Sequence, residues 1–427
     1  MRYNIFMRIF ISGISGTAMG PLALMAKKIG FEVFGTDLLE GAVTNELVRE
    51  GIEARIGEQD GKFLEEKFEN GGVDWFVYTS ALPDDHAELQ KAREFGIKTS
   101  KRDEFIEFLR ERASLKMIAV AGTHGKTTTT AGIVFLATRL GLPVSWLVGT
   151  TLGFEEAGKY VEGSEFLIYE ADEYDRNFLY YHPFLSIIPS ISYDHPDIFP
   201  TEEDYKKAFE QFESQSRKII KTTELDKKLS VSGKVRRFDL GLAIEAVREM
   251  IATLENEGKL PEGDFSEENM IQIANQFPGV GRRMERLTKG VYSDYAHHPE
   301  EIKSTIEIAK EEAEKDGFLG VVVVYEPHQN IRQHEVFSGY KDAFLGVEKV
   351  FWMPTFLTRE NPELKIIEPK EFVESLENFE VAETAEFNEE LYLKLKDYLE
   401  RGYLVLLMSA GPGDKWFRKH FSSMEEN

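Results

Sequence analysis

The stretch Lys116-Met-Ile-Ala-Val-Ala-Gly-Thr-His-Gly-Lys-Thr-Thr128 is the part of the sequence that decides the fold. An apolar run typical of a buried parallel strand leads directly into a glycine turn and a series of threonines. In a phosphate loop, small residues let backbone N–H groups turn inward, a lysine reaches the terminal phosphates, and a hydroxyl binds Mg²⁺. We therefore predict a nucleotide-binding loop, followed by a helix from Thr127, made of these residues: Gly122, Thr123, His124, Gly125, Lys126, Thr127 and Thr128. Because Val120 replaces the first glycine of the general motif, the alternative is a plain glycine turn beside a solvated lysine.

The same order of apolar strand, glycine-containing turn and helix occurs before and after this stretch. Strands are expected at residues 8–13, 31–36, 74–80, 166–169, 185–188, 291–293, 320–325, 349–353 and 403–408. Strands that alternate with helices indicate parallel α/β sheets, and 427 residues are too many for one core. The sequence predicts an α/β protein of three domains, at residues 1–112, 113–287 and 288–427.

The second half of the central block is interpreted as two helices separated by a loop. The helices are expected at residues 202–212 and 239–257. The segment 214–234 between them is polar and rich in serine and lysine, which is typical of a surface loop. A further loop is expected at residues 258–267.

Carboxylates crowd the end of the strand at residues 166–169, in Glu170-Ala-Asp-Glu-Tyr-Asp175. Like charges this close are unfavourable unless a cation binds, and Mg²⁺ bridges phosphates through one or two carboxylates. Asp194 and His195 follow the next strand, where the carboxylate can fix the tautomer of the imidazole. We therefore predict metal ligands at Thr127, Glu170 and His195. An acidic surface loop and a surface histidine are the alternatives.

A second glycine turn, Gly13-Ile-Ser15-Gly16-Thr-Ala-Met-Gly20, follows the first strand. Asp37 follows after a second strand, where a carboxylate that binds ribose would lie. We predict that a nucleotide with a pyrophosphate binds here. Taken alone the turn would indicate NAD, but the phosphate loop argues against a plain dehydrogenase.

Composition and charge exclude several classes of function. The formal net charge is −24, from 75 acidic and 51 basic side chains, and a field of that sign repels nucleic acid and anionic membranes. The sequence contains no cysteine, which excludes disulfides and thiol chemistry and fits a reducing cytoplasm. It also contains no run of about 18 apolar residues. We expect a cytoplasmic protein without nucleic acid partners or membrane insertion.

Together the motifs resemble the Mur ligase family over nearly the whole chain. The phosphate loop, Glu170 and His195 look like the ATP loop and two magnesium sites of that family, and the first glycine turn with Asp37 and Ser80 looks like its UDP-binding domain. The remaining similar stretches are Phe277-Pro-Gly-Val-Gly-Arg-Arg283-Met-Glu285, Asp294-Tyr-Ala-His297-His298-Pro299, Glu326-Pro-His328-Gln-Asn-Ile-Arg332 and Ser409-Ala-Gly-Pro-Gly-Asp414. The resemblance implies a Rossmann-like UDP-binding domain, a central domain like a P-loop ATPase and a Rossmann-like C-terminal domain.

The activity implied by the resemblance is ATP-dependent, ADP-forming amide-bond ligation in peptidoglycan precursor synthesis. An amine would be joined to the lactyl carboxylate of UDP-N-acetylmuramate through an acyl phosphate, with ATP and two Mg²⁺ ions. The likeness is closest to members that attach L-alanine; members that attach a recycled peptide, L-Ala-γ-D-Glu-meso-diaminopimelate, are also similar. The implied catalytic residues are Lys126, Glu170, His195 and Arg332; Arg283 and Asp294 would bind ATP, and His297, His298, His328 and Arg332 the amino acid.

One stretch departs from the family pattern. The family has an asparagine-rich motif that meets the nucleotide, whereas this chain has Arg236-Arg237-Phe238-Asp239, so Asp239 or the arginines are the candidate substitutes. The departure favours an alternative of another class, a Mur-like protein that binds UDP-sugar and ATP without ligation. A ligase that extends folate is disfavoured by the first glycine turn and Asp37.

Overall fold

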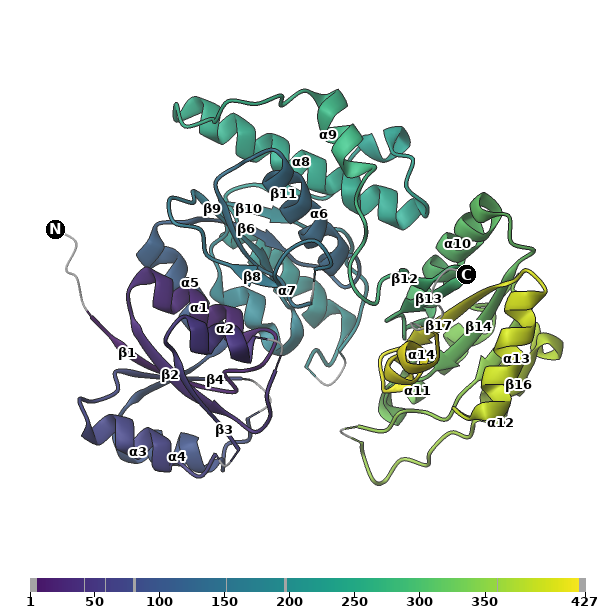
Figure 1. Ribbon diagram of the computed structural model, residues 1–427, viewed down its shortest axis with the longest axis horizontal. Coiled ribbons are helices and arrows are strands. Elements are labelled where there is room, and N and C mark those ends of the chain that lie inside the picture. Colours follow the sequence, from purple (N-terminus) through teal and green to yellow (C-terminus); the bar gives the residue numbers. More distant parts are fainter. Residues whose placement is uncertain are drawn as a thin grey trace. The chain divides into compact units, whose positions relative to one another are not determined.

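The computed structural model describes residues 6–41, 43–57, 59–79, 82–150, 152–195, 198–358 and 360–421. These residues form two compact units. One unit lies within Met1–Leu229 and Phe238–Pro278, and the other within Ser230–Arg237 and Gly279–Asn427. The first unit contains two sheets and the second unit contains one (Figure 1). The predicted α/β class is confirmed, with sheets that are mainly parallel.

The first sheet has the strand order β3-β2-β1-β4-β5, and all of its pairs are parallel. Its elements are β1 (Arg8–Ser12), α1 (Met19–Ile29), β2 (Glu32–Asp37), α2 (Thr44–Arg49), β3 (Glu53–Ile56), α3 (Lys62–Glu69), β4 (Trp75–Tyr78), α4 (Ala87–Glu94), β5 (Lys98–Lys101) and α5 (Arg102–Ala113). Helices α3 and α4 cover one face over a cluster of phenylalanines, and α1 and α5 cover the other (Figure 1). Apolar side chains are buried on both faces, as expected for a parallel sheet.

The central sheet has the order β11-β10-β6-β9-β7-β8, in which only the β7–β8 pair is antiparallel among the described strands. Its elements are β6 (Lys116–Val120), α6 (Lys126–Arg139), β7 (Val144–Leu147), β8 (Gly158–Lys159), β9 (Phe166–Glu170), η1 (Tyr174–Tyr180), β10 (Leu185–Ile187), α7 (Glu202–Gln215), β11 (Ile219–Ile220), η2 (Leu225–Lys228), α8 (Lys234–Asn256) and α9 (Glu267–Ala274). One apolar core continues from the first sheet into this one through α5, α7 and η1.

The loop predicted at residues 214–234 is wrong in part. The segment contains the short edge strand β11 and the 3-10 turn η2, and α8 begins at Lys234 instead of Asp239. Polar composition did not reveal β11, because a two-residue strand at a sheet edge needs few apolar side chains. The early start of α8 places Ser230–Arg237 in the second compact unit, where Gly233 N and Arg237 Nη1 donate to Glu311.

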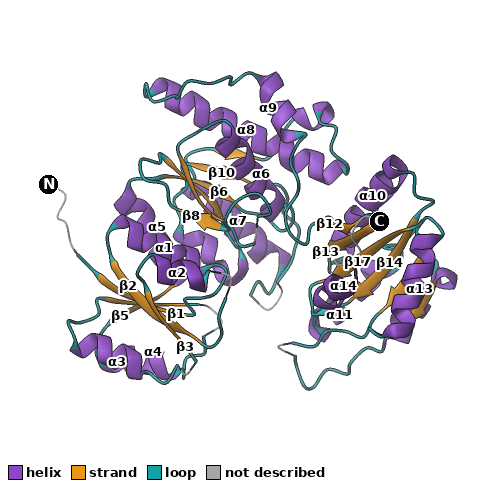
Figure 2. Cartoon of the chain, in the orientation of Figure 1, coloured by secondary structure: helices purple, strands orange, loops and turns teal. Residues whose placement is uncertain are grey.

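The third sheet has the order β12-β13-β17-β14-β15-β16, with only the β12–β13 pair antiparallel among the described strands (Figure 2). Its elements are β12 (Glu285–Thr288), β13 (Val291–Asp294), α10 (Pro299–Asp316), β14 (Val321–Glu326), α11 (Asn330–Val336), η3 (Phe337–Tyr340), β15 (Lys349–Trp352), α12 (Pro369–Ser375), η4 (Phe379–Val381), β16 (Ala382–Thr384), α13 (Glu389–Glu400), β17 (Leu404–Ser409) and α14 (Gly413–Phe421). Helices α10 and α12 pack on one face, and α13 and α14 on the other.

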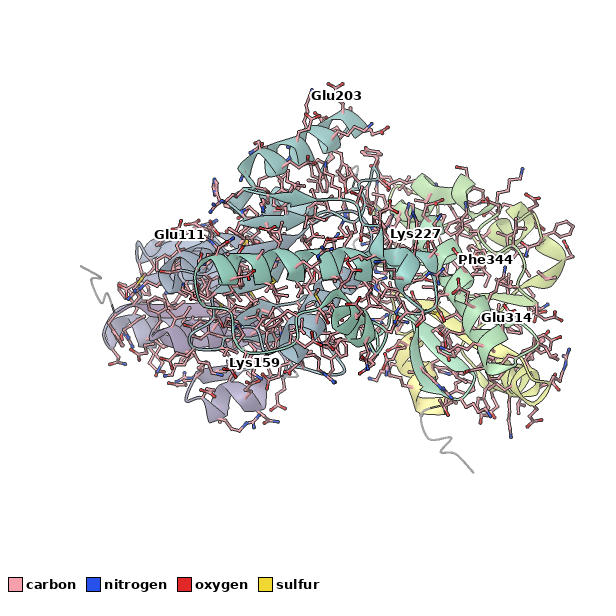
Figure 3. The ribbon with its side chains drawn as sticks, turned by 90° about the horizontal axis from the view of Figure 1, so that it is seen from above. Glu111, Lys159, Glu203, Lys227, Glu314 and Phe344 are labelled. Atoms are coloured by element: carbon pink, nitrogen blue, oxygen red, sulfur yellow. The ribbon has the colours of Figure 1, made fainter. Side chains whose placement is uncertain are left out.

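Charged side chains lie at the surface of helices in the first unit. Figure 3 shows Glu203 of α7 and Glu111 of α5 at the surface, and both residues are exposed. None of the helices in the described part of the chain combines the length and the apolar character that crossing a bilayer requires.

Candidate active site

The predicted phosphate loop joins the carboxyl end of β6 to the first turn of α6. Gly125 is the residue before the helix and has a φ of 84°, a left-handed conformation that glycine adopts without strain. Thr123 N donates to Ser190 O at 3.1 Å and His124 N donates to Ser190 Oγ at 2.8 Å, so the segment after β10 supports the loop. The helix begins at Lys126, one residue before the predicted start, and its positive end therefore faces the loop.

Lys126 lies in the loop as the predicted phosphate-binding cation. Its ammonium group donates to Gly122 O at 2.6 Å and forms an ion pair with Glu173 Oε2 at 2.7 Å. Burial raises the pKa of the Glu173 carboxyl to about 7, against the opposing charge of Lys126. Burial would lower the pKa of Lys126, but Glu173 and the neighbouring carboxylates hold it above its ordinary value. Lys126 is therefore charged at neutral pH.

Thr127 and Glu170 form the oxygen-rich corner predicted to bind metal. Thr127 Oγ1 donates to Glu170 Oε1 at 2.7 Å, and Gly149 N donates to Glu170 Oε2 at 3.3 Å. Across the described residues, no three His, Asp or Glu side chains form a ready-made metal cluster. Mg²⁺ commonly takes one or two protein oxygens and completes its shell with water and substrate phosphates. The hydroxyl and carboxylate therefore fit Mg²⁺ held jointly with a nucleotide.

Replacing Glu170 with Gln should weaken a magnesium-dependent activity. The amide keeps an oxygen for the Thr127 hydroxyl but loses the charge that attracts the cation, so we expect about a tenfold higher Mg²⁺ requirement and about tenfold lower kcat. The measurement is the rate of ATP turnover against Mg²⁺ concentration. Glu162→Gln, at an exposed position of the same unit, is the control. An unchanged Mg²⁺ requirement in Glu170→Gln would remove Glu170 from the metal site.

His195 lies beside the same acidic loop. Its Nε2 is 3.8 Å from Glu173 Oε1 and 3.6 Å from Asp194 Oδ2, and its backbone has a φ of 57°. A left-handed non-glycine residue is uncommon and is often found where a side chain must be aimed. The structure thus brings His195 next to the ion pair of Lys126 and Glu173. Pro196 and Asp197 of the same motif lie outside the described residues.

Asp239 of α8 reaches the phosphate loop, at the position where the family pattern departs. It is buried, and a methyl group on Gly125 would lie only 2.6 Å from Asp239 Oδ1. Arg236 and Arg237 belong to the second compact unit. Among the candidate substitutes for the asparagine motif, Asp239 lies against the phosphate loop.

The first glycine turn is tied to the end of β2. Gly13 N and Ile14 N donate to Thr36 O at 2.8 and 3.0 Å, and Ser15 N donates to Asp37 Oδ2 at 2.9 Å. Asp37 thus shapes the turn, and Gly13 adopts a φ of 82° that suits glycine. Gly16 N closes the turn by donating to Gly13 O. Ser80, the remaining residue predicted for this site, lies outside the described residues.

His297 and His328 come together at the carboxyl end of the third sheet, with ring centres 5.8 Å apart. His297 Nδ1 lies 3.0 Å from Tyr295 O and 3.4 Å from Glu301 Oε2. Burial lowers the pKa of His297 to about 4, which the Glu301 carboxylate opposes and the charge of Arg332 assists. The imidazole of His297 is therefore neutral at pH 7, and the positive charge of Arg332 helps to keep it so.

Three other predicted residues of this unit have structural partners. His298 caps α10 by accepting from Glu300 N at 3.4 Å, in a capping box with Glu301. Asp294 is buried, and its oxygens accept from Met284 N and Ala296 N, both at 2.7 Å. Arg283 lies with its guanidinium 5.3 Å from the centre of the Tyr295 ring. These contacts order the strand ends around the histidines.

The depressed pKa of His297 predicts an acid-sensitive third sheet. An imidazole with a folded pKa of about 4 and an unfolded pKa of about 6.5 binds fewer protons when folded. Its contribution to stability is complete above about pH 6.5 and is lost as pH falls toward 4, on the order of 3 kcal/mol. Urea unfolding at pH 7 and pH 4.5 measures this loss. His297→Gln should reduce it, whereas exposed His334→Gln should not; equal losses in both variants would refute the assignment.

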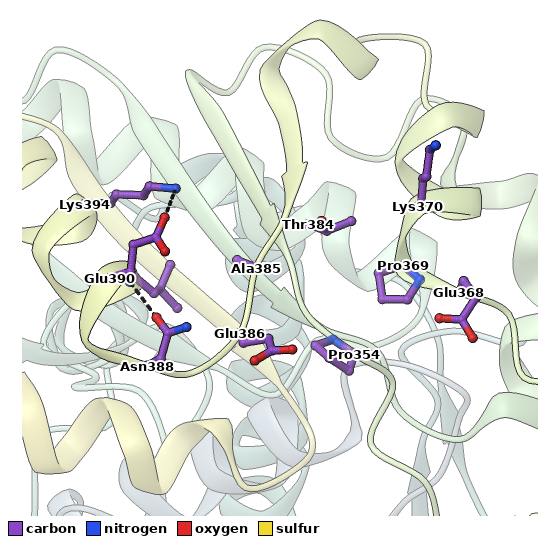
Figure 4. A pocket seen from close by; sticks show the side chains of 11 residues that line it. Pro354, Glu368, Pro369, Lys370, Thr384, Ala385, Glu386, Asn388, Glu390 and Lys394 are labelled. Atoms are coloured by element: carbon purple, nitrogen blue, oxygen red, sulfur yellow. Dashed lines mark hydrogen bonds and ion pairs between the residues drawn. The ribbon is translucent and has the colours of Figure 1, made fainter.

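Glu173 is the main site residue to which the sequence interpretation gave no role. It was recognised within the acidic stretch, but its ion pair with Lys126 joins residues 47 positions apart and has no local signature. A pocket in the second unit, between β16, α12 and α13, contains none of the predicted site residues (Figure 4). Its lining includes Lys370, Thr384, Asn388 and Lys394.

The phosphate loop, the adjacent carboxylates and the separate glycine turn define a P-loop α/β protein. Two family models match the chain: the catalytic domain of the Mur ligase family over residues 8–113, and the Mur ligase middle domain over residues 120–259. The chain belongs to the Mur ligase family, as the resemblance predicted.

Curated relatives cover most of the chain. A UDP-N-acetylmuramate–L-alanine ligase of Lactobacillus delbrueckii subsp. bulgaricus is 30% identical over 82% of this chain and 84% of its own length. One of Clostridium perfringens is 29% identical over 95% of each chain. Among solved structures, the UDP-N-acetylmuramate–alanine ligase of Thermotoga maritima matches with a TM-score of 0.71 at 22% identity, over 97% of this chain and 98% of that one. A murein peptide ligase of Psychrobacter arcticus matches with a TM-score of 0.59 at 19% identity, over 99% and 100%. At these identities the two structures support the fold.

Proposed function

We propose that the protein is an ATP-dependent, ADP-forming ligase that joins L-alanine to the lactyl carboxylate of UDP-N-acetylmuramate. The observation that carries the proposal is the arrangement of Lys126, Thr127 and Glu170 at the start of α6. The names of the curated relatives support this choice of substrates. We place the reaction in the cytoplasm. We also propose that the chain has three domains, with boundaries near residues 112 and 287.

The residues of the central sheet are suited to phosphoryl transfer. Lys126 and the loop N–H groups would hold the β- and γ-phosphates and spread the charge of the transferred group. Thr127 and Glu170 would hold one Mg²⁺, and His195 would be a ligand of a second. When bound, Mg²⁺ would supply electrostatic stabilisation of the phosphates. Glu173 would keep Lys126 aimed at the nucleotide, because the ion pair is buried and its geometry is restricted.

The residues of the third sheet are suited to an amino acid. Arg332 presents a planar cation that pairs with a carboxylate through two parallel hydrogen bonds. His297 is held neutral, so it adds no competing positive charge and can order the amine side of the substrate. We assign His328 and Arg332 to the same amino-acid site, and Arg283 to the nucleotide. The lactyl carboxylate would attack the γ-phosphate of ATP and release ADP. The neutral amine would then attack the resulting acyl phosphate, forming the amide bond and releasing inorganic phosphate.

The second candidate is a ligase that attaches a recycled peptide to the same UDP-sugar. It is favoured by the stretch Glu170-Ala-Asp-Glu-Tyr-Asp175, which resembles the members that attach a recycled peptide. A protein that binds UDP-sugar and ATP without ligation is the remaining alternative, supported by Asp239 in place of the asparagine motif.

Phosphate release from ATP tests these candidates. The full chain is assayed with UDP-N-acetylmuramate and Mg²⁺, adding L-alanine, other single amino acids, or the tripeptide. Release that requires L-alanine supports the proposal, and release only with the tripeptide supports the peptide ligase. If UDP-N-acetylmuramate binds but no amine elicits release, the protein is a non-catalytic binder.

A further inference from the structure

A buried carboxylate lies beneath the first glycine turn. Glu88, in the first turn of α4, is completely buried. Its Oε2 accepts from Ser12 Oγ at 2.6 Å and its Oε1 accepts from Thr36 Oγ1 at 2.7 Å. Gln59 Nε2 donates to both hydroxyl oxygens at 3.1 Å and lies 3.4 Å from Glu88 Oε2. Four side chains from four segments thus form one closed hydrogen-bond network.

The network holds the two strand ends that present the turn. Ser12 is the last residue of β1 and pairs in register with Thr36 of β2. Gly13 follows Ser12 directly, and Asp37 follows Thr36. The carbonyl of Thr36 also accepts from the N–H group of Gly13. A shift of either hydroxyl would therefore move the backbone of the turn itself.

The chemistry of the network requires an acceptor on Glu88. Each hydroxyl has one proton, which it donates to the carboxylate, and its lone pairs then accept from the Gln59 amide. Burial raises the pKa of Glu88, and the hydrogen bonds from the two hydroxyls oppose this change. His86, before the first residue of α4, also lowers the pKa of Glu88, and Asp60, before α3, raises it. A buried charge is unfavourable unless its hydrogen-bond partners are well placed. The desolvation of this carboxylate is therefore offset only while the Ser12 and Thr36 hydroxyls stay in position.

We infer that Glu88 is a positioning residue of the UDP-sugar site: it clamps Ser12 and Thr36 so that the glycine turn is preorganised for the diphosphate. The inference rests on the proposed function, because it takes the UDP-sugar as the ligand of the turn. Glu88 is separated from that ligand by the ends of β1 and β2 and acts through them.

Glu88→Gln tests the clamp with a change of few atoms. The new amide brings two N–H groups to a place where only donors point, so one hydroxyl must turn away and the turn loses its support. We expect the Kd for UDP-N-acetylmuramate, measured by calorimetry on the full chain, to rise about tenfold. The KM for ATP and the kcat at saturating UDP-sugar should stay unchanged.

The swapped double variant separates positioning from general damage. Glu88→Gln with Gln59→Glu keeps one carboxylate and one amide in the same network. One hydroxyl can donate to the carboxylate at position 59 and accept from the amide N–H at position 88, while the other hydroxyl donates to the amide oxygen at position 88. We expect it to recover most of the lost affinity, while Glu94→Gln on the exposed side of α4 binds like the wild type. Equal affinity of the wild type and Glu88→Gln would overturn the inference alone. Failure of the double variant to recover affinity would also overturn it, and a wild type that binds no UDP-sugar would overturn the proposed function with it.

Discussion

Lys126→Ala is expected to lower kcat about 10³-fold, because in the proposed function it removes the cation that would face the terminal phosphates of ATP. Lys126 donates to the loop carbonyl of Gly122 and pairs with Glu173, so its ammonium group is held inside the loop. A charge fixed in this way needs no reorganisation when the phosphoryl group is transferred, and the loss should therefore appear in kcat more than in substrate affinity. The measurement is the steady-state rate of ADP formation with saturating UDP-N-acetylmuramate and L-alanine.

The ion pair makes the same variant informative about stability. Without Lys126 the buried Glu173 carboxylate has lost its partner, which costs about 3–5 kcal/mol if it stays ionised. Burial raises the pKa of Glu173 to about 7 even against the charge of Lys126, so without that charge the carboxyl takes up a proton more readily, and the destabilisation should shrink as pH falls below 7. Lys126→Ala with Glu173→Gln should regain stability without regaining activity. A single variant with wild-type kcat would exclude Lys126 from phosphoryl transfer.

Affinity for UDP-N-acetylmuramate is the internal control for both variants. The first glycine turn lies on a different sheet from Lys126, and its hydrogen bonds involve neither Lys126 nor Glu173. Calorimetric binding of the UDP-sugar should therefore be unchanged. A parallel loss of UDP-sugar affinity would mean that the variant is misfolded and that its low kcat carries no information on mechanism.

The parts of the site that were predictable are those that follow strands directly. Lys126 and Thr127 could be placed because strand, glycine turn and helix are contiguous in the sequence, and Glu170 because parallel strands end at the same edge. The family and the α/β fold are confirmed on the same basis. The order of residues within a motif is enough to place such side chains, since the motif itself determines the local backbone geometry.

The parts that were not predictable depend on contacts across the fold. Glu88 is 76 residues from Ser12 in the sequence, and a glutamate in the first turn of a helix ordinarily signals an exposed residue. Only the packing of α4 against the first sheet reveals that it is buried. The same holds for β11, whose two residues join the sheet at an edge. Burial of a charge is a tertiary property with no signature in the local sequence.

Gly125→Ala is expected to lower the rate of ATP-dependent turnover at least about 100-fold, because the added methyl group clashes with fixed neighbours of the loop. The residue has a φ of 84°, and an added methyl group would lie 2.6 Å from Asp239 Oδ1 and 3.0 Å from Pro189 Cβ. Both neighbours are anchored, because Asp239 is buried in α8 and Pro189 precedes the Ser190 that supports the loop. Relief of the contact must therefore displace the backbone that precedes Lys126.

Gly141→Ala is the matched control, because Gly141 also has a positive φ, 69°, but an added methyl group would meet nothing within 4 Å. Both variants should lose roughly 1–2 kcal/mol of stability from the left-handed backbone alone. Only Gly125→Ala adds the clash, so only it should lose ATP turnover, measured as ADP formation beside urea unfolding. Combining Gly125→Ala with Asp239→Ala removes the closer contact and should restore part of the activity. Equal activity of the two glycine variants would show that the phosphate loop tolerates displacement and that Asp239 does not constrain it.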